Sequence, residues 1–233
     1  MLASYSTTQI LRIVISVVLV MFSAVVHEVA HGWAANRLGD PTAKEAGRLT
    51  LNPAAHLDPV GSIILPLVMG LMGGPVFAFA KPVPYNPNRL RNPRRDEVLV
   101  ALAGPASNFL QALLGTAILY VYYHWCVSSI QSGAMLSVDT ASRVLVIIET
   151  YIYVNLLLMF FNLIPLPPLD GSKVIFLFLS GNARRTYYKI QSYAMPILLI
   201  CMFVLPSVIG MDPLGSYLDV TAGWLYNMLV SMV

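Results

Sequence analysis

Residues 10–36 read ILRIVISVVLVMFSAVVHEVAHGWAAN, an apolar run that carries the pentapeptide His27-Glu28-Val29-Ala30-His31 near its end. A helix that spans a bilayer needs about 20 apolar residues, so this run is long enough to cross with some tilt. Ionisable side chains on a membrane helix are costly and need partners. The position of the pentapeptide therefore predicts a functional site rather than a solvated polar patch.

The pentapeptide has the pattern H-E-x-x-H. Residues four apart share one face of a helix, so both imidazoles can bind one metal ion while Glu28 lies beside them as a base. A catalytic Zn²⁺ site takes three protein ligands and lowers the pKa of a water molecule to about 7. Arg37 stands where extended zinc-protease patterns place a third His. The third ligand must therefore come from elsewhere, and the candidates are Glu45, Glu149 and Asp170, with His56 less favoured.

The composition of the whole chain is that of an integral membrane protein. Of 233 residues, 57% are hydrophobic and 11% are charged, and the mean hydropathy is +0.71. Spanning helices consume most of such a chain and leave no room for a sizeable soluble domain. The formal charge of +3 is modest, so we expect no nucleic-acid partner. Cys126 and Cys201 are expected to pack in apolar segments, and the first apolar segment is expected to be retained rather than cleaved.

The remaining apolar segments predict an all-α polytopic membrane protein with about five to six membrane helices. Beyond the first, we expect spanning helices at about 98–125, 142–163 and 190–209, and a weaker one at 217–233. A single membrane-embedded domain is expected over 1–233, with the catalytic core at about 10–180 and accessory helices at about 190–233.

Two shorter segments are predicted to be irregular. Residues 59–72 contain Pro66 and form a run of about fourteen apolar residues, a length that favours a re-entrant or interfacial piece. Residues 74–85 are rich in turn formers, β-branched and aromatic residues, which predicts a short membrane-associated β-hairpin. The prolines of this hairpin allow only edge strands.

Three motifs together resemble a known family. They are His27-Glu28-x-x-His31, then Gly104-Pro-Ala-Ser-Asn108, and then Asn162-Leu-Ile-Pro-Leu-Pro-Pro-Leu-Asp170-Gly171. Their order and spacing resemble the site-2 protease family of intramembrane zinc metalloproteases over about residues 20–180. We expect neither a PDZ-like insert nor a nucleotide-sensing tail. The chain is most similar to the compact branch whose loop reads NPAAHLDP, here residues 52–59.

The resemblance implies a specific chemistry. It implies that His27, His31 and Asp170 bind one Zn²⁺, that Glu28 is the general base, and that a peptide bond within a membrane-spanning substrate is hydrolysed. It also suggests that Asn162 lies near the catalytic centre. Asn162 or Asn108 could donate an amide N–H to the developing oxyanion. Asn108 also suits a packing role, because small residues surround it.

The topology offers an independent test of these ligands. If residues 59–72 cross the bilayer, His31 and Asp170 fall near opposite faces and cannot share a metal ion. If that segment re-enters, both ligands lie near one face, together with all Lys and Arg residues except Arg12 and Arg143. The positive-inside rule makes that face cytoplasmic. We therefore expect an N-terminus outside the cytoplasm, and a site that opens toward the cytoplasm of a bacterial or archaeal plasma membrane.

Other assignments stay open at this stage. The hairpin, with Phe77 and Phe79, either captures an unwound substrate as an added strand or is a structural loop that dips into the membrane. His56 either approaches the metal or makes loop hydrogen bonds. The expected partners are the lipid bilayer and a membrane-spanning protein substrate. A zinc transporter and a catalytically silent membrane chaperone are the alternative functions.

Overall fold

The computed structural model describes residues 7–58, 61, 64, 67–68, 81–133, 137–200, 204–210 and 212–233. Within these residues all regular structure is helical. Three helices are long and apolar enough to cross a membrane, namely α1 (Thr7–Arg37), α4 (Pro93–Gln131) and α5 (Val138–Asn162). They confirm the helices predicted at 10–36, 98–125 and 142–163. The re-entrant segment predicted at 59–72 and residues 74–80 of the predicted hairpin lie largely outside the described residues.

α1 has one face for lipid and one face for protein. Ile10, Val14, Val18 and Phe22 recur every fourth residue and are exposed, as side chains that face lipid would be. The opposite face buries smaller or polar side chains, including Val17, Val20, Ser23 and His27. Ser23 and His27 therefore point into the protein, whereas Gln9 and Arg12 near the start of the helix are exposed.

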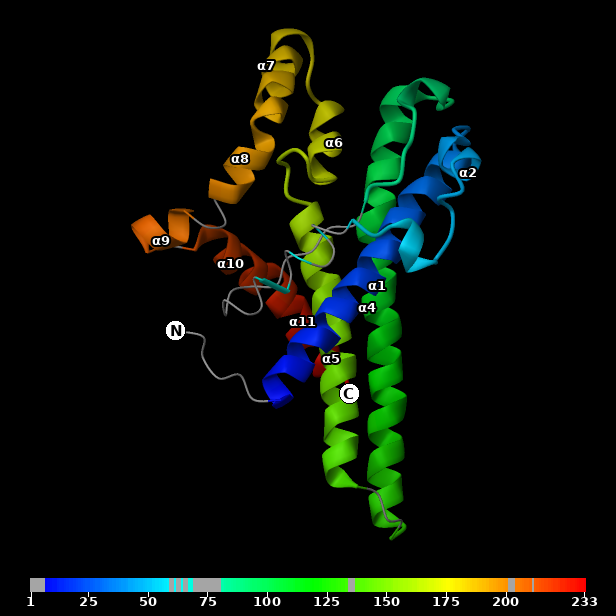
Figure 1. The fold of residues 1–233 in the computed structure, drawn as a ribbon, viewed down its shortest axis with the longest axis vertical. Coiled ribbons are helices and arrows are strands. Elements are labelled where there is room, and N and C mark those ends of the chain that lie inside the picture. The colour runs from blue at the N-terminus through cyan, green and yellow to red at the C-terminus, as the bar shows by residue number, and fades with distance from the viewer. Residues whose placement is uncertain are drawn as a thin grey trace.

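α4 and α5 are antiparallel neighbours that run side by side (Figure 1). Pro93 suits the first position of α4, since its missing N–H has no partner there in any helix. Ser137 caps α5 by accepting a hydrogen bond from the Thr140 amide. Their shared core holds Ala112, Leu119, Ile152 and Leu156. A Cβ at Gly115 would lie 2.8 Å from Ile152 Cγ1, so this small residue permits the close approach.

The end of α1 meets the start of α4. The Arg91 amide donates to the Leu38 carbonyl over 3.1 Å, and the Asn86 amide donates to Asp40 Oδ2 over 2.5 Å. The residues described between these points include the short helices α2 (Thr42–Glu45), η1 (Pro53–Ala55) and η3 (Pro87–Arg89). The chain between Leu38 and Arg91 therefore leaves one end of the helix bundle and returns to the same end.

After α5 the chain turns through a proline-rich segment into α6 (Gly171–Phe176). Asp170 immediately precedes α6. Antiparallel packing of α4 and α5 returns Asp170 to the end of the bundle where α1 stops and α4 starts. Lys173 Nζ lies 3.1 Å from Glu97 Oε1 and links α6 to the first turns of α4.

The C-terminal region is made of shorter helices: α7 (Gly181–Ser192), α8 (Ala194–Leu199), α9 (Leu205–Ile209), α10 (Pro213–Leu218), the π-helix η5 (Asp219–Gly223) and α11 (Trp224–Val230). The segment predicted at 190–209 is interrupted at Tyr193, because Pro196 has no N–H to donate to the Ser192 carbonyl. α10, η5 and α11 follow one another without a gap, where a weaker helix was predicted. Ala222 and Leu229 pack against the α4–α5 core.

Candidate metal centre

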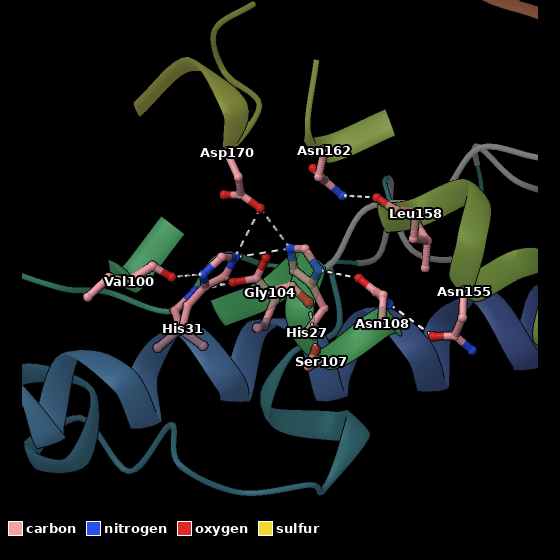
Figure 2. A network of polar contacts seen from close by, with 12 residues as sticks. His27, His31, Val100, Gly104, Ser107, Asn108, Asn155, Leu158, Asn162 and Asp170 are labelled. Atoms are coloured by element: carbon pink, nitrogen blue, oxygen red, sulfur yellow. Dashed lines mark hydrogen bonds and ion pairs between the residues drawn. The ribbon is translucent and has the colours of Figure 1, made fainter. Parts of the chain in front are cut away.

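Three side chains from two distant parts of the sequence converge beside α4 (Figure 2). His27 Nε2 and His31 Nε2 lie 3.0 Å apart. Asp170 Oδ2 lies 3.1 Å from the first nitrogen and 3.3 Å from the second. In the part of the chain that the structure describes, no other group of three or more His, Cys, Asp or Glu side chains is arranged to share a metal ion.

The hydrogen bonds of the two imidazoles fix where their protons are. His31 Nδ1 lies 2.7 Å from the Val100 carbonyl oxygen, which can only accept. His27 Nδ1 lies 2.6 Å from Asn108 Oδ1. Each Nδ1 therefore carries a hydrogen, so a neutral ring at either position directs its Nε2 lone pair at the same point. Metal-binding histidines almost always donate their other ring N–H in this way.

These donor atoms fit a zinc ion. Ligand atoms about 2.0–2.1 Å from a tetrahedral Zn²⁺ lie about 3.3 Å from each other, which agrees with the observed separations. Asp170 Oδ2 is buried and accepts no hydrogen bond from any described residue. Three converging lone pairs repel each other unless a cation shares them. Two imidazoles and a carboxylate with one position left open are a ligand set of the catalytic zinc type.

Two glycines make room for the ligands. A Cβ at Gly104 would lie 2.5 Å from Cε1 of both His27 and His31, so any larger residue would displace the rings. A Cβ at Gly171 would lie 2.7 Å from the Ile164 carbonyl oxygen, which shows how tightly the chain folds back beside Asp170. The glycines of the second and third motifs are thus required by close approach at the site itself.

Glu28 lies on α1 between the two histidines and has a backbone partner. The Val83 amide donates to Glu28 Oε2 over 2.8 Å. Val83 is buried, and its Cγ1 would lie 2.8 Å from a Cβ placed on Gly32, one turn after Glu28. Oε1 of Glu28 has no hydrogen-bond partner among the residues described here. One oxygen of the carboxylate is therefore anchored, while the other remains available.

Val83, which contacts Glu28, lies in segment 81–85, the described end of the predicted hairpin, and this segment forms no strand. The Lys81 amide donates to the His56 carbonyl over 2.8 Å, and the Tyr85 hydroxyl donates to Glu97 Oε1 over 3.3 Å. Burial, and then the negative charge of Glu97, raise the pKa of the Tyr85 hydroxyl above its usual range. The hydroxyl therefore stays protonated and keeps its role as a donor.

The structure places the other candidate residues as follows. The Asn108 amide nitrogen donates to Asn155 Oδ1 over 3.0 Å, and its oxygen faces His27. The Asn162 amide nitrogen lies 2.9 Å from the Leu158 carbonyl oxygen, as Figure 2 shows. His56 is buried outside the ligand group, and its Nε2 bonds to the Thr50 carbonyl oxygen over 2.8 Å. Phe77 and Phe79 lie outside the described residues.

Of the carboxylates considered as a third ligand, only Asp170 joins the histidines. Glu45 forms a 2.7 Å ion pair with Arg89 on the surface. Glu149 interacts with Tyr226, between α5 and α11. The convergence of residues so far apart in sequence depends on the antiparallel packing of the long helices.

Three features of the site were not assigned a role from the sequence. They are the Val83 amide that binds Glu28, the Val100 carbonyl that binds His31, and the Ser23 hydroxyl that accepts from Asn155. Backbone groups leave no signal in the residue types. Ser23 did carry one, because it precedes His27 by four residues and so shares its helix face.

Comparisons with known proteins agree with this geometry. Residues 15–205 match the family described as "Peptidase family M50". The chain is 36% identical over 201 residues to the "Putative zinc metalloprotease YwhC" of Bacillus subtilis (strain 168), a match that covers 86% of this chain and 82% of that protein.

A more distant relative is longer than this chain. The chain is 25% identical over 182 residues to the "Putative zinc metalloprotease Rip2" of Mycolicibacterium smegmatis, covering 78% of this chain and 64% of that protein. No solved structure matches the chain significantly. The match over most of the chain, the relatives and the ligand geometry lead to one assignment: the chain belongs to peptidase family M50, the site-2 protease family, and is a zinc metalloprotease with membrane helices.

Proposed function

We propose that the protein hydrolyses a peptide bond within or next to a transmembrane segment of a substrate protein, with His27, His31 and Asp170 as the zinc ligands. The observation that carries this proposal is the position of the three ligand atoms, which lie inside a bundle of helices long and apolar enough to cross a membrane. A substrate segment must therefore enter at membrane depth to be cleaved.

The proposed chemistry assigns one role to each side chain near the centre. Bound Zn²⁺ would supply Lewis acidity, which polarises a carbonyl and makes water easier to deprotonate. Glu28 takes a proton from the attacking water through its available oxygen, Oε1, and then delivers that proton to the leaving amine. The Val83 amide holds the other oxygen and so fixes the carboxylate. Asn162 has a second amide hydrogen, which we assign to the developing oxyanion.

The proposed topology is re-entrant at residues 59–72, with the N-terminus outside the cytoplasm and the site near the cytoplasmic face. The hydrogen bonds from Arg91 to Leu38 and from Asn86 to Asp40 support it, because they hold the end of α1 beside the start of α4. An odd number of crossings between these points would separate them.

Cysteine labelling tests this topology. In a chain whose own Cys126 and Cys201 are replaced by Ala, single cysteines at Lys44 and Asn92 are expected to react from the same side of the membrane. A cysteine at Ser132, in the turn between α4 and α5, should react only from the other side. Opposite accessibility of Lys44 and Asn92 would defeat the re-entrant topology.

We propose that the substrate is captured as an added strand by the segment that contains Phe77 and Phe79. The described residues 81–85 support this proposal, because they bind the protein itself and leave the earlier residues of the segment to bind substrate. The Lys81 and Val83 amides both bind the protein, while Pro82 and Pro84 have no N–H to offer on the other edge. Capture would therefore use residues before Lys81. Phe77→Pro should reduce cleavage with zinc retained, whereas Phe77→Leu should cleave normally.

The deciding experiment compares the wild type with Glu28→Gln on purified protein. The variant is expected to retain zinc and to lose cleavage of single-span substrates by about 10²–10⁴-fold, the usual loss when a general base is removed. Zinc flux into liposomes, measured in parallel, should be absent. Zinc flux without cleavage would indicate a transporter. If wild type and Glu28→Gln both bind zinc but show neither cleavage nor flux, the protein would be a catalytically silent chaperone.

The same variant can identify substrates. A protein that binds but does not cleave should accumulate in complex with its membrane substrates, which can be recovered by crosslinking in native membranes. Wild type treated in the same way is the control, because it releases its products.

A further inference from the structure

A continuous line of hydrogen bonds runs from α5 through α4 to the zinc ligand His27 on α1 (Figure 2). Asn155 Nδ2 lies 2.9 Å from the Tyr151 carbonyl oxygen and 3.0 Å from Ser23 Oγ. Asn108 Nδ2 lies 3.0 Å from Asn155 Oδ1, and His27 Nδ1 lies 2.6 Å from Asn108 Oδ1. Ser23, Asn108 and Asn155 are each 0% exposed. No step of this line is open to solvent.

The direction of the line is fixed at its far end by the peptide backbone. The Tyr151 carbonyl can only accept, so Asn155 must turn its amide nitrogen toward it. Asn155 then directs its side-chain oxygen at Asn108, so Asn108 must donate a hydrogen bond from its amide nitrogen. The oxygen of Asn108 is consequently directed at His27, and His27 Nδ1 must be the donor. Reversing any one amide would place two donors or two acceptors against each other in a site without water.

This direction matters because an imidazole cannot use one nitrogen for a proton and a metal at once. With the hydrogen held on Nδ1, the Nε2 lone pair of His27 faces Asp170 and His31. If Asn108 presented its nitrogen instead, Nδ1 would have to accept, and Nε2 would carry the hydrogen and repel a cation. Without a partner, the side-chain amide of Asn108 could rotate and exchange its oxygen and nitrogen. The hydrogen bond to Asn155 prevents this rotation.

We propose that Asn155 and Asn108 are positioning residues that set the tautomer of His27, and through it the affinity of the centre for zinc. This inference rests on the proposed zinc centre. It gives Asn108 a role that does not depend on contact with substrate, because its amide oxygen faces His27 Nδ1. It also extends the functional site to Asn155, which touches none of the three ligands.

The test is the zinc affinity of the purified full chain, measured by competition with a chelator. Asn155→Leu frees the amide of Asn108 and should weaken zinc binding at least about tenfold, the lower range for loss of such outer partners. Asn155→Asp should stay within about threefold of wild type, because a carboxyl accepts from Asn108 in either protonation state.

The matched control is Tyr151→Phe. It removes another hydrogen bond between α4 and α5, from the Tyr151 hydroxyl to Gln111 Oε1 at 2.9 Å, but leaves the Tyr151 carbonyl in place. It should lower thermal stability without changing zinc affinity. If Asn155→Leu behaves like Tyr151→Phe, losing stability but not zinc affinity, the proposal is wrong.

A second pair of variants decides the matter if Asn155→Leu does not fold. Asn108→Asp keeps an acceptor for His27 Nδ1 and should bind zinc within about threefold of wild type, while Asn108→Leu should lose about tenfold or more. Equal losses in both would overturn the proposal. A wild-type protein that binds no zinc at all would instead contradict the zinc centre itself, so the two failures are distinguishable.

Discussion

Two aspartates withdrawn from solvent lie at the same end of the helix bundle and have opposite surroundings. Asp40 Oδ1 accepts from the Thr42 amide at 3.0 Å and from the Thr42 hydroxyl, and its Oδ2 accepts from the Asn86 amide at 2.5 Å. Asp170 Oδ2 faces the lone pairs of two imidazoles and accepts no hydrogen bond from the described residues. One carboxylate is surrounded by donors and the other by further acceptors.

The difference separates an acidic residue with a structural role from a candidate metal ligand. A buried carboxylate needs donors or a cation to compensate for lost hydration. Around Asp40 the protein supplies the donors itself, and this closes the loop between α1 and α4. Around Asp170 no described donor completes the set, and a cation shared with the two imidazoles would supply the compensation. Burial of an acidic residue alone would not have distinguished the two.

The largest expected effect is on zinc binding when each aspartate is neutralised. Asp170→Asn should lower zinc affinity by at least about a hundredfold and abolish cleavage, because the loss of a charged ligand exceeds that of an outer partner. Asp40→Asn should keep zinc affinity within about threefold. Metal analysis after dialysis, followed by chelator competition, measures both. A comparable loss of zinc affinity in the two variants would show that Asp170 and Asp40 do not differ in their contribution to zinc binding.

The next effect comes from the glycine beside the ligands. Gly104→Ala places a methyl group 2.5 Å from carbons of both imidazole rings, and should lower zinc affinity about thirtyfold, or about 2 kcal/mol of overpacking. Gly115→Ala on the same helix is the control, because its Cβ would meet Ile152 instead, at 2.8 Å. It should reduce thermal stability and leave zinc binding unchanged. Normal zinc affinity in Gly104→Ala would show that the rings can move freely.

Asp40 should instead govern stability, and should do so in a pH-dependent way. Burial raises the pKa of Asp40. The hydrogen bonds from Thr42 and Asn86, together with the charge of Arg89, lower it by more than burial raises it, so the net shift of the pKa is downward. A carboxyl whose pKa is lowered in the folded state stabilises the fold above its unfolded pKa of about 3.9, and this contribution is lost as the pH falls through the folded pKa.

Asp40→Asn is therefore expected to cost about 1–2 kcal/mol at pH 7, in line with loss of a charge-assisted hydrogen bond. The gap from wild type should narrow as the pH falls below about 4. Thermal unfolding in detergent at several pH values measures it. The exposed Asp139→Asn should show no such gap, and a gap for Asp40→Asn that widens on acidification would contradict the assignment.

The smallest expected effect on zinc affinity comes from the ion pair that links α6, the helix after Asp170, to α4. Lys173→Met removes the 3.1 Å ion pair with Glu97, which is partly exposed and worth at most about 1 kcal/mol. Zinc affinity should fall by less than about threefold, because Gly171 and the proline-rich turn also position Asp170. A larger loss would mean that Asp170 depends on this pair, and that its site is less preorganised than the loop around Asp40.

Much of this molecule could be predicted from sequence because the signals were local. The apolar run at 10–36 and its H-E-x-x-H pattern predict both the helix and two of the ligands, since helix periodicity alone places residues four apart on one face. Asp170 was one of several acidic candidates from residue types, and it was the family resemblance that singled it out. The break at Tyr193 in the segment predicted at 190–209 was missed, although Pro196 gave a local signal.

The sequence by itself determined the membrane character, the long helices and the H-E-x-x-H pattern that places His27 and His31 on one helix face, because hydrophobicity and residue spacing act over a few turns of chain. The family resemblance implied Asp170, and the tertiary structure brings it to the two histidines. Only the tertiary structure showed which amide holds Glu28 and which way Asn108 points. These depend on hydrogen bonds between groups brought together by antiparallel helix packing, with backbone carbonyls and amides as partners, and every residue type carries those groups alike.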